Sequence, residues 1–356
     1  MAKKQEKNCR LGTAGGQALI EGIMMNSPNG AAVAVRKPDG SIVVKRKNMK
    51  RLKDRYKVLG LPFVRGIVGF IESMILGYKS LMESAELSGM LELEESEKEQ
   101  NQGKFDAWLE KHLGEKMMGV ISVVAMVLGL GLAMLLFTFL PAFLFDKINL
   151  YLADGGLIHF KALFEGVIRI VVFILYLFAV SKMKEIKRTF MYHGAEHKTI
   201  FCYEANEELV PENIKKFVRF HPRCGTSFLF TVLVIGILIS SAVLTIFPVL
   251  GQDENRLLWV AIKILIMPLI MGVGYEFIRF AGRHDNAFTR LLSSPGLLMQ
   301  RLTTIEPTED MLEVAVAALE GALATEDFGE RILNAPKAED ESAAPSDEPG
   351  AEGEAL

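Results

Sequence analysis

Residues 117–145 read MMGVISVVAMVLGLGLAMLLFTFLPAFLF, which is 29 consecutive positions without a charged side chain. An α-helix rises about 1.5 Å per residue, so a run of this length crosses the roughly 30 Å hydrocarbon core of a bilayer with some tilt. Gly225–Gln252 is a second uncharged run. The mean hydropathy of +0.25 agrees with these runs. The sequence therefore predicts a membrane protein.

Two shorter apolar segments, Ile170–Ser181 and Ile264–Tyr275, contain 12 uncharged residues each. Each reaches the length of a span only if charged neighbours are included, and these neighbours are Glu165, Arg169, Lys263 and Glu276. We expect about four transmembrane helices, paired as two hairpins, in a mainly α, polytopic fold.

The distribution of Lys and Arg predicts the orientation of the spans. The loop 182–224 holds nine of these residues, whereas the hairpin connections 146–156 and 251–257 hold one each. The N-terminal residues 1–57 hold fourteen Lys/Arg against four Asp/Glu. Because basic loops stay on the cytoplasmic side, we expect a multi-pass protein of the cytoplasmic (inner) membrane with both termini in the cytoplasm. The helix 61–87 then does not cross the membrane.

The segments outside the spans predict a small cytosolic part. Two strand-like segments, Ala31–Arg36 and Ser41–Arg46, flank the turn residues Lys37-Pro38-Asp39-Gly40, and a further strand-like run lies within Gly12–Met25. We expect about three strands here. Thr308 followed by two acidic residues predicts the capped start of an amphipathic helix.

These features divide the chain into six predicted units. They are a basic β-hairpin region (1–60), an amphipathic interfacial helix (61–90), an acidic linker (91–116), a four-span membrane domain with the loop 182–224 (117–281), a C-terminal helical region (282–334) and a disordered acidic tail (335–356).

The stretch His193-Gly194-Ala195-Glu196-His197 is the strongest candidate for chemistry. Two histidines four residues apart project from the same face of a helix and can reach one ion. The H-x-x-E-H pattern also occurs in a class of metallopeptidases, in which the glutamate is the general base. We therefore expect a divalent metal ion, with zinc preferred, and Glu196 as the candidate base. The alternatives are two histidines paired with lipid headgroups or carboxylates, and a solvated glutamate.

Further ligands are expected from other parts of the chain. His221 is the preferred third ligand, and Cys224 could join it as a thiolate. Glu276 could instead complete the site from the last span, because an ionisable group at membrane depth usually faces a partner or a cavity. Cys224 could also be an inert buried thiol, and Glu276 could form an ion pair with Arg279 or Arg283.

Four stretches together resemble one known family, the bacterial YqhQ-like family. They are Gly15–Met25 (GGQALIEGIMM), His193–Thr199 (HGAEHKT), His221–Ser227 (HPRCGTS) and Leu302–Pro307 (LTTIEP). The resemblance covers roughly residues 12–323. It implies an integral membrane protein of unknown function that is described as a metal-dependent enzyme, and it does not name a reaction.

Two functions are compatible with these observations. The first is a metal-dependent hydrolase at the cytosolic membrane face, acting on a membrane-embedded or lipid-linked substrate. The second is a non-catalytic scaffold or biogenesis factor with a structural metal site, recruiting a cytosolic protein partner. We expect membrane lipids as neighbours and no nucleic acid, because basic charge beside a leaflet commonly matches anionic lipid. Three scattered cysteines give no disulfide framework.

Overall fold

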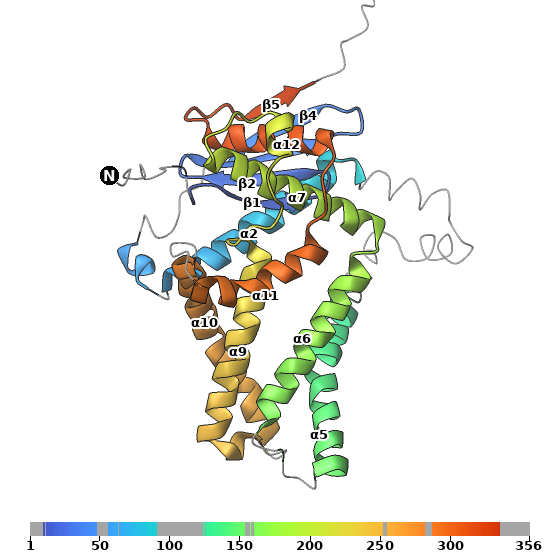
Figure 1. The fold of residues 1–356 in the computed structure, drawn as a ribbon, viewed down its shortest axis with the longest axis vertical. Helices are drawn as coiled ribbons and strands as arrows, with labels where there is room; N and C mark the ends of the chain where they lie inside the picture. The colour runs from blue at the N-terminus through green and yellow to red at the C-terminus, as the bar shows by residue number, and fades with distance from the viewer. Residues whose placement is uncertain are drawn as a thin grey trace, which may run out of the picture.

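The computed structural model describes residues 10, 12–47, 56–62, 64–90, 124, 126–153, 157, 160–251, 255–281 and 287–334. A small sheet with helices on both faces lies at one end of a group of long helices (Figure 1). The mainly α, polytopic fold expected from the sequence is confirmed. The predicted acidic linker 91–116 and disordered tail 335–356 lie outside the described residues.

The sheet has five antiparallel strands in the order β1-β2-β3-β4-β5. The strands are β1 (Gly15–Leu19), β2 (Gly22–Ser27), β3 (Gly30–Arg36), β4 (Ile42–Lys47) and β5 (Glu330–Leu333). The predicted turn between β3 and β4 is confirmed, since the Lys37 amide donates to the Ser41 carbonyl at 2.8 Å.

The sheet differs from the expected three strands in two ways. The N-terminal run forms two strands rather than one, because the chain reverses at Ile20 and Glu21, and Glu21 adopts a left-handed φ of 47°. The fifth strand comes from the far end of the sequence and pairs with β4. Local sequence patterns carry no information about such a long-range pairing.

Both faces of the sheet are covered, which explains why nearly every residue of β2 and β3 is buried. Helices α7 (Lys184–Glu204) and α12 (Glu309–Leu323) cover one face and form the main hydrophobic core with it. Helix α2 (Val64–Leu87) covers the other face, where it packs on a smaller cluster that includes Leu19 and Val33. Thr308 does precede α12 as predicted, but its side chain makes no capping hydrogen bond.

Four helices among the described residues are long and apolar enough to cross a membrane. Their candidate spans are Met126–Tyr151, Lys161–Val180, Gly225–Ile246 and Leu258–Phe277. The first runs from the helical residues 126–134 through the π-helical η2 (Leu135–Phe139) into α5 (Leu140–Ala153). The others belong to α6 (Lys161–Val180), α9 (Gly225–Ile246) and α10 (Arg256–Ala281). Helix α5 packs on α6 and α9 packs on α10, as the two hairpins require.

Charged residues inside the spans pair with one another. Glu165 lies 2.8 Å from Arg169 on the same helix and 3.7 Å from Lys263 on α10. Arg169 also donates through Nε to the Phe137 carbonyl at 2.8 Å. In a π-helix the backbone hydrogen bonds run from residue i to i+5 and depart from the regular α-helical pattern. The guanidinium of Arg169 therefore gives the Phe137 carbonyl a hydrogen-bond donor, which lipid chains cannot provide. The contact between Glu165 and Lys263 therefore links the two hairpins, and it keeps charged side chains paired within the spans.

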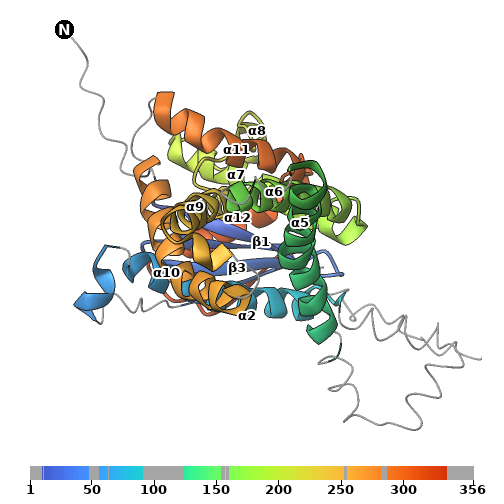
Figure 2. The ribbon, with the colours of Figure 1, turned by 90° about the horizontal axis from the view of Figure 1, so that it is seen from below.

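Shorter elements complete the fold around the junction between sheet and spans. Helix α11 (Ala287–Thr303) packs on α9 and, seen from below, passes along one side of α9 and α6 (Figure 2). The remaining elements are η1 (Lys57–Gly60), α8 (Pro211–Ile214) and η4 (Pro248–Gly251).

Candidate metal centre

The two histidines of the HGAEH stretch lie one turn apart in the buried middle of α7. Their ring centroids are 4.4 Å apart, and His193 and His197 expose 8% and 1% of their surface. Helix α7 packs between β1 and α12, and the residues around the histidines belong to the main core. The helix thus projects both imidazoles from one face, as the four-residue spacing predicts.

Each imidazole is oriented by a backbone carbonyl. His193 Nδ1 lies 2.8 Å from the Thr303 oxygen, and His197 Nδ1 lies 2.5 Å from the Arg219 oxygen. A carbonyl can only accept, so Nδ1 is the donor in both rings and Nε2 is the atom left to bind a metal. This arrangement is typical of metal-ligating histidines, whose second nitrogen is fixed by the surrounding protein.

The Nε2 atom of His197 has no hydrogen-bond partner within the described part of the chain, although it is buried. A buried polar atom without a partner costs about 1–3 kcal/mol, and such atoms call for an explanation. A bound cation would supply the missing partner. The donor chemistry of the site therefore fits a metal ion.

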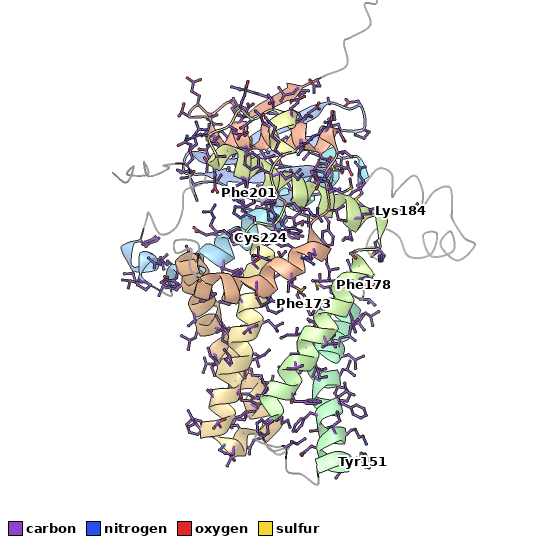
Figure 3. All side chains as sticks on the ribbon, viewed as in Figure 1. Tyr151, Phe173, Phe178, Lys184, Phe201 and Cys224 are labelled. Carbon is purple, nitrogen blue, oxygen red and sulfur yellow. The ribbon has the colours of Figure 1, made fainter. Side chains whose placement is uncertain are left out.

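Cys224 approaches the histidines from the start of α9. Its Sγ lies 3.1 Å from His193 Nε2 and accepts the Thr226 amide at 3.4 Å. The thiolate is the form of a cysteine side chain that binds metals. Cys224 lies at the level where the long helices meet the sheet-bearing part (Figure 3).

The three side chains are close enough to share an ion. One potential ligand atom from each of His193, His197 and Cys224 lies within 4.8 Å of the other two. Zinc bonds of about 2.0–2.3 Å place tetrahedral ligands roughly 3.3–3.8 Å apart. Small side-chain adjustments could therefore bring these atoms onto one cation.

His221 lies beside this group but is turned differently. Its ring centroid is 5.4 Å from that of His197, and its Nδ1 accepts the Arg223 amide at 3.3 Å. Burial lowers the pKa of His221 well below its usual value, with further lowering by the charges of His197 and Arg223, so the ring is neutral. Arg223 is in turn held by an ion pair with Glu204.

Glu196 lies on the β1 side of the centre. Its carboxyl carbon would be 3.0 Å from a Cβ placed on Gly16, and its Oε2 is buried without a hydrogen-bond partner among the described residues. Burial raises the pKa of Glu196 to about 7, while the charge of His193 and the amides of Gly16 and Ala18 act in the opposite direction. Glycine at position 16 leaves room for this carboxyl group.

Glu276 is not brought into this group. Its carboxylate accepts two hydrogen bonds from the Arg65 guanidinium, at 2.7 Å and 2.6 Å. The sequence predicts either a ligand role or an ion pair with Arg279 or Arg283, whose side chains lie outside the described residues. The observed partner comes from α2, and this contact ties α2 to the end of the candidate span Leu258–Phe277.

The segment Leu302–Pro307 crosses α7 at Gly194. A Cβ on Gly194 would lie 2.0 Å from the Ile305 oxygen, so no larger residue fits without moving the backbone. The close approach is fixed by the Ile305 amide, which donates to the Phe190 carbonyl at 2.9 Å. Glycine in the HGAEH stretch therefore allows the Thr303 carbonyl to reach His193.

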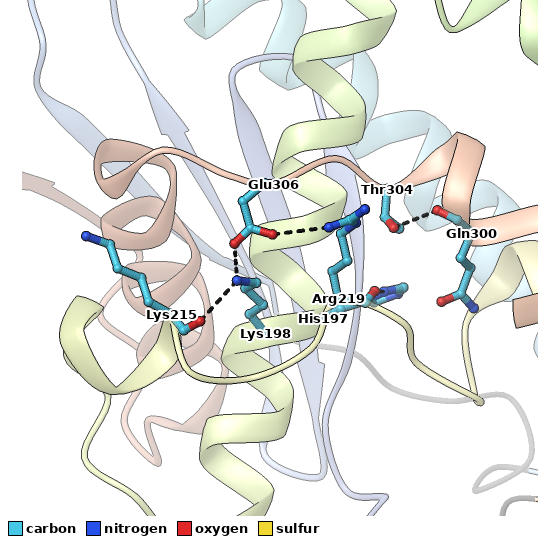
Figure 4. A network of polar contacts seen from close by, with 7 residues as sticks. All are labelled: His197, Lys198, Lys215, Arg219, Gln300, Thr304 and Glu306. Carbon is cyan, nitrogen blue, oxygen red and sulfur yellow. Dashed lines mark hydrogen bonds and ion pairs between the residues drawn. The ribbon is translucent and has the colours of Figure 1, made fainter. Parts of the chain in front are cut away.

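An ionic network anchors the same segment on its other side (Figure 4). Buried Lys198 forms an ion pair with Glu306 and donates to the Lys215 carbonyl at 3.2 Å. Arg219 reaches Glu306 at 3.3 Å, and its own carbonyl holds His197. The network thus connects α7, the segment after α11 and the loop before Cys224.

Gln300 fixes the loop that carries His221 and Cys224. Its Oε1 accepts the His221 amide at 2.7 Å, and its Nε2 donates to the His221 carbonyl at 2.7 Å and to Ser227 Oγ at 2.9 Å. Sequence reasoning missed Gln300, Thr303 and Arg219 as supporting residues. Every residue type has a backbone carbonyl, so the sequence does not show which carbonyls orient the histidines. The sequence points to this region in one way, because Leu302–Pro307 is one of the four stretches that carry the family resemblance.

Comparison with known proteins shows the family of the chain but does not identify a reaction. A model of the family described as "Protein of unknown function (DUF1385)" matches residues 61–325. The "Uncharacterized protein YqhQ" of Bacillus subtilis (strain 168) is 31% identical over 321 residues, which cover 89% of this chain and 94% of that protein. No solved structure matches.

Proposed function

This chain belongs to the DUF1385 family of proteins of unknown function, and we propose that it is a membrane metalloenzyme that hydrolyses a membrane-embedded or lipid-linked substrate. The ion is divalent, with zinc preferred, and His193, His197 and Cys224 hold it. The observation that carries the proposal is the buried His197 Nε2, which lacks a protein partner among the described residues while Nδ1 is fixed by a carbonyl.

The donor set supports a catalytic centre because three protein ligands leave a coordination position open. Catalytic zinc sites commonly have three protein ligands and a water, and a bound zinc ion lowers the pKa of that water to about 7. Glu196 follows His193 by three residues on the same helix and keeps a buried carboxylate oxygen unpaired within the described structure. It is the group placed to accept a proton as general base.

The location of the centre supports a substrate from the membrane. Cys224 immediately precedes the third candidate span, and Thr303 ends the helix that packs on that span. The excess of Lys and Arg in the loop 182–224 supports the cytosolic face of the cytoplasmic membrane.

Replacing Glu196 by Gln tests the hydrolytic proposal. Cells that lack the chain would receive the wild-type protein or the E196Q variant, and the lipids and small peptides of their membranes would be compared by mass spectrometry. The amide keeps the side-chain size but cannot accept the proton, so the E196Q profile should match that of cells without the protein. E196Q should retain its metal. A variant that binds metal and restores the wild-type profile would remove the hydrolase function.

The position of His221 favours a second candidate, a scaffold with a structural zinc site. Its ring lies beside His197, and a change of rotamer would give a closed shell of three histidines and one cysteine, as structural zinc sites have. Such a protein would recruit a cytosolic partner instead of catalysing a reaction.

X-ray absorption at the metal edge separates these two candidates. For the enzyme we expect two nitrogen ligands and one sulfur at the zinc, with a light oxygen ligand replaceable by added azide. The closed shell would instead show three nitrogens and one sulfur, with no change on adding azide. Absence of sulfur from the spectrum would contradict both ligand sets, because each contains Cys224.

A further inference from the structure

Helix α2 has two opposite faces of different character. The residues that meet the sheet are small and buried, and they include Gly77, Ser80 and Ser84. On the opposite face five large apolar side chains are between 46% and 65% exposed. They are Ile71, Met74, Ile75, Tyr78 and Met82, and we call them the α2 stripe. Their spacing of three and four residues puts them on one helix face.

The α2 stripe begins where the membrane-spanning helices end. Gly66 packs on Tyr275, and Arg65 binds Glu276, both at the end of the span Leu258–Phe277. Phe70 lies 5.8 Å from Phe228 in the first turns of α9, measured between ring centroids. From these contacts α2 runs along the side of the sheet that faces the long helices (Figures 1 and 2).

The placement of the stripe beside the spans is what would be expected for a helix face in contact with lipid. The sheet lies behind α2, so the stripe faces the side on which the spans continue into the bilayer. An amphipathic helix at a membrane surface buries its apolar face by about 5–10 Å at the boundary between headgroups and acyl chains. Tyr78 suits that boundary because its ring is apolar and its hydroxyl is polar.

Charge also agrees with a membrane surface. Lys79 and Glu86 lie to one side of the stripe and are exposed, so they can reach the headgroup layer. The sequence between β4 and the helix, residues 48–57, contains five Lys/Arg and one acidic residue. Basic residues beside a membrane helix are attracted to anionic lipid headgroups.

We propose that α2 lies in the membrane surface beside the four spans, with the α2 stripe in contact with the acyl chains of the adjoining leaflet. The occupant is the lipid of the same membrane. This contact sets the height of the sheet above the bilayer, because α2 is packed on the sheet along its buried face.

Tryptophan substitution in the full-length protein, reconstituted in liposomes, tests this contact. Y78W and I75W place a fluorophore on the stripe, and E320W places one on the exposed face of α12 as an aqueous control. Emission of the two natural tryptophans is subtracted with the wild-type protein. Lipids brominated near the middle of the acyl chain should remove about half or more of the added emission of Y78W and I75W, given the expected depth. Iodide in the water should quench E320W alone.

Two results would overturn the proposal. Quenching of Y78W and I75W by iodide, with no effect of brominated lipid, would place the stripe in water. Protection from both quenchers would show that protein covers it, either a second copy or a different partner. Two stripe variants are used because a single tryptophan could disturb the packing around its own position, whereas agreement between Y78W and I75W reports on the stripe as a whole.

Discussion

Replacing both His193 and His197 by Ala is expected to remove the metal from the purified protein. The free energy of zinc binding to a protein site is about 10 kcal/mol or more, so each of three or four ligands contributes roughly 3 kcal/mol to binding. Loss of two ligands should therefore weaken binding by about 10⁴-fold. The wild-type protein should carry close to one divalent ion per chain, and the double variant should carry almost none. Elemental analysis of detergent-purified protein measures this directly.

The control must separate loss of the ligands from loss of the fold. K184A/K187A changes two exposed residues of the same helix and should keep the metal. H193Q/H197Q keeps the side chains polar and of similar size, and it should lose the metal as completely as the alanine pair. Equal metal content in the wild-type protein and both histidine variants would contradict the site, as would a wild-type protein without metal.

The spans and the histidine pair could be predicted because their signals are local. A charge-free run of 29 residues has few alternatives to a membrane helix, and four-residue spacing fixes the relation of His193 to His197 once a helix is assumed. Cys224 could be included because it follows closely on His221 and has the right chemistry for zinc. These inferences required no knowledge of distant contacts.

The parts that sequence reasoning missed depend on contacts between distant segments. Arg65 and Glu276 are 211 positions apart, and β5 pairs with β4 across most of the chain. The carbonyl groups of Thr303 and Arg219 orient the histidines, although their side chains give no hint of it. Glu276 illustrates the general difficulty, since a carboxylate at membrane depth predicts a partner but does not identify one.

The relation between the motifs becomes clear only in three dimensions. HGAEHKT contains the two histidines of the proposed site, HPRCGTS contains the thiol beside them, and LTTIEP contains the carbonyl that orients His193. The first stretch, GGQALIEG, brings Gly16 against Glu196. Four segments that resemble one family in sequence therefore meet around one group of side chains.

Replacing Gln300 by Leu is expected to weaken both the fold and the metal site. The apolar side chain fills a similar volume but leaves the His221 amide, the His221 carbonyl and Ser227 Oγ without their buried partner. Each lost partner costs about 1–3 kcal/mol, so the protein should melt about 5–10 °C lower in detergent. Metal affinity should fall by about 10–100-fold, as it does when groups that orient metal ligands are removed.

Measuring the two effects separately shows whether Gln300 positions the ligands or only stabilises the chain. Thermal unfolding would be followed with and without a chelator, and affinity by competition with a metal-binding dye. R301A, at the exposed neighbouring position, should change neither quantity. Q300E keeps the acceptor for the His221 amide but loses the donor, so it should fall between the wild-type protein and Q300L. A lower melting temperature with unchanged metal affinity would mean that the loop from His221 to Cys224 keeps its geometry without Gln300, and the positioning role would then be wrong.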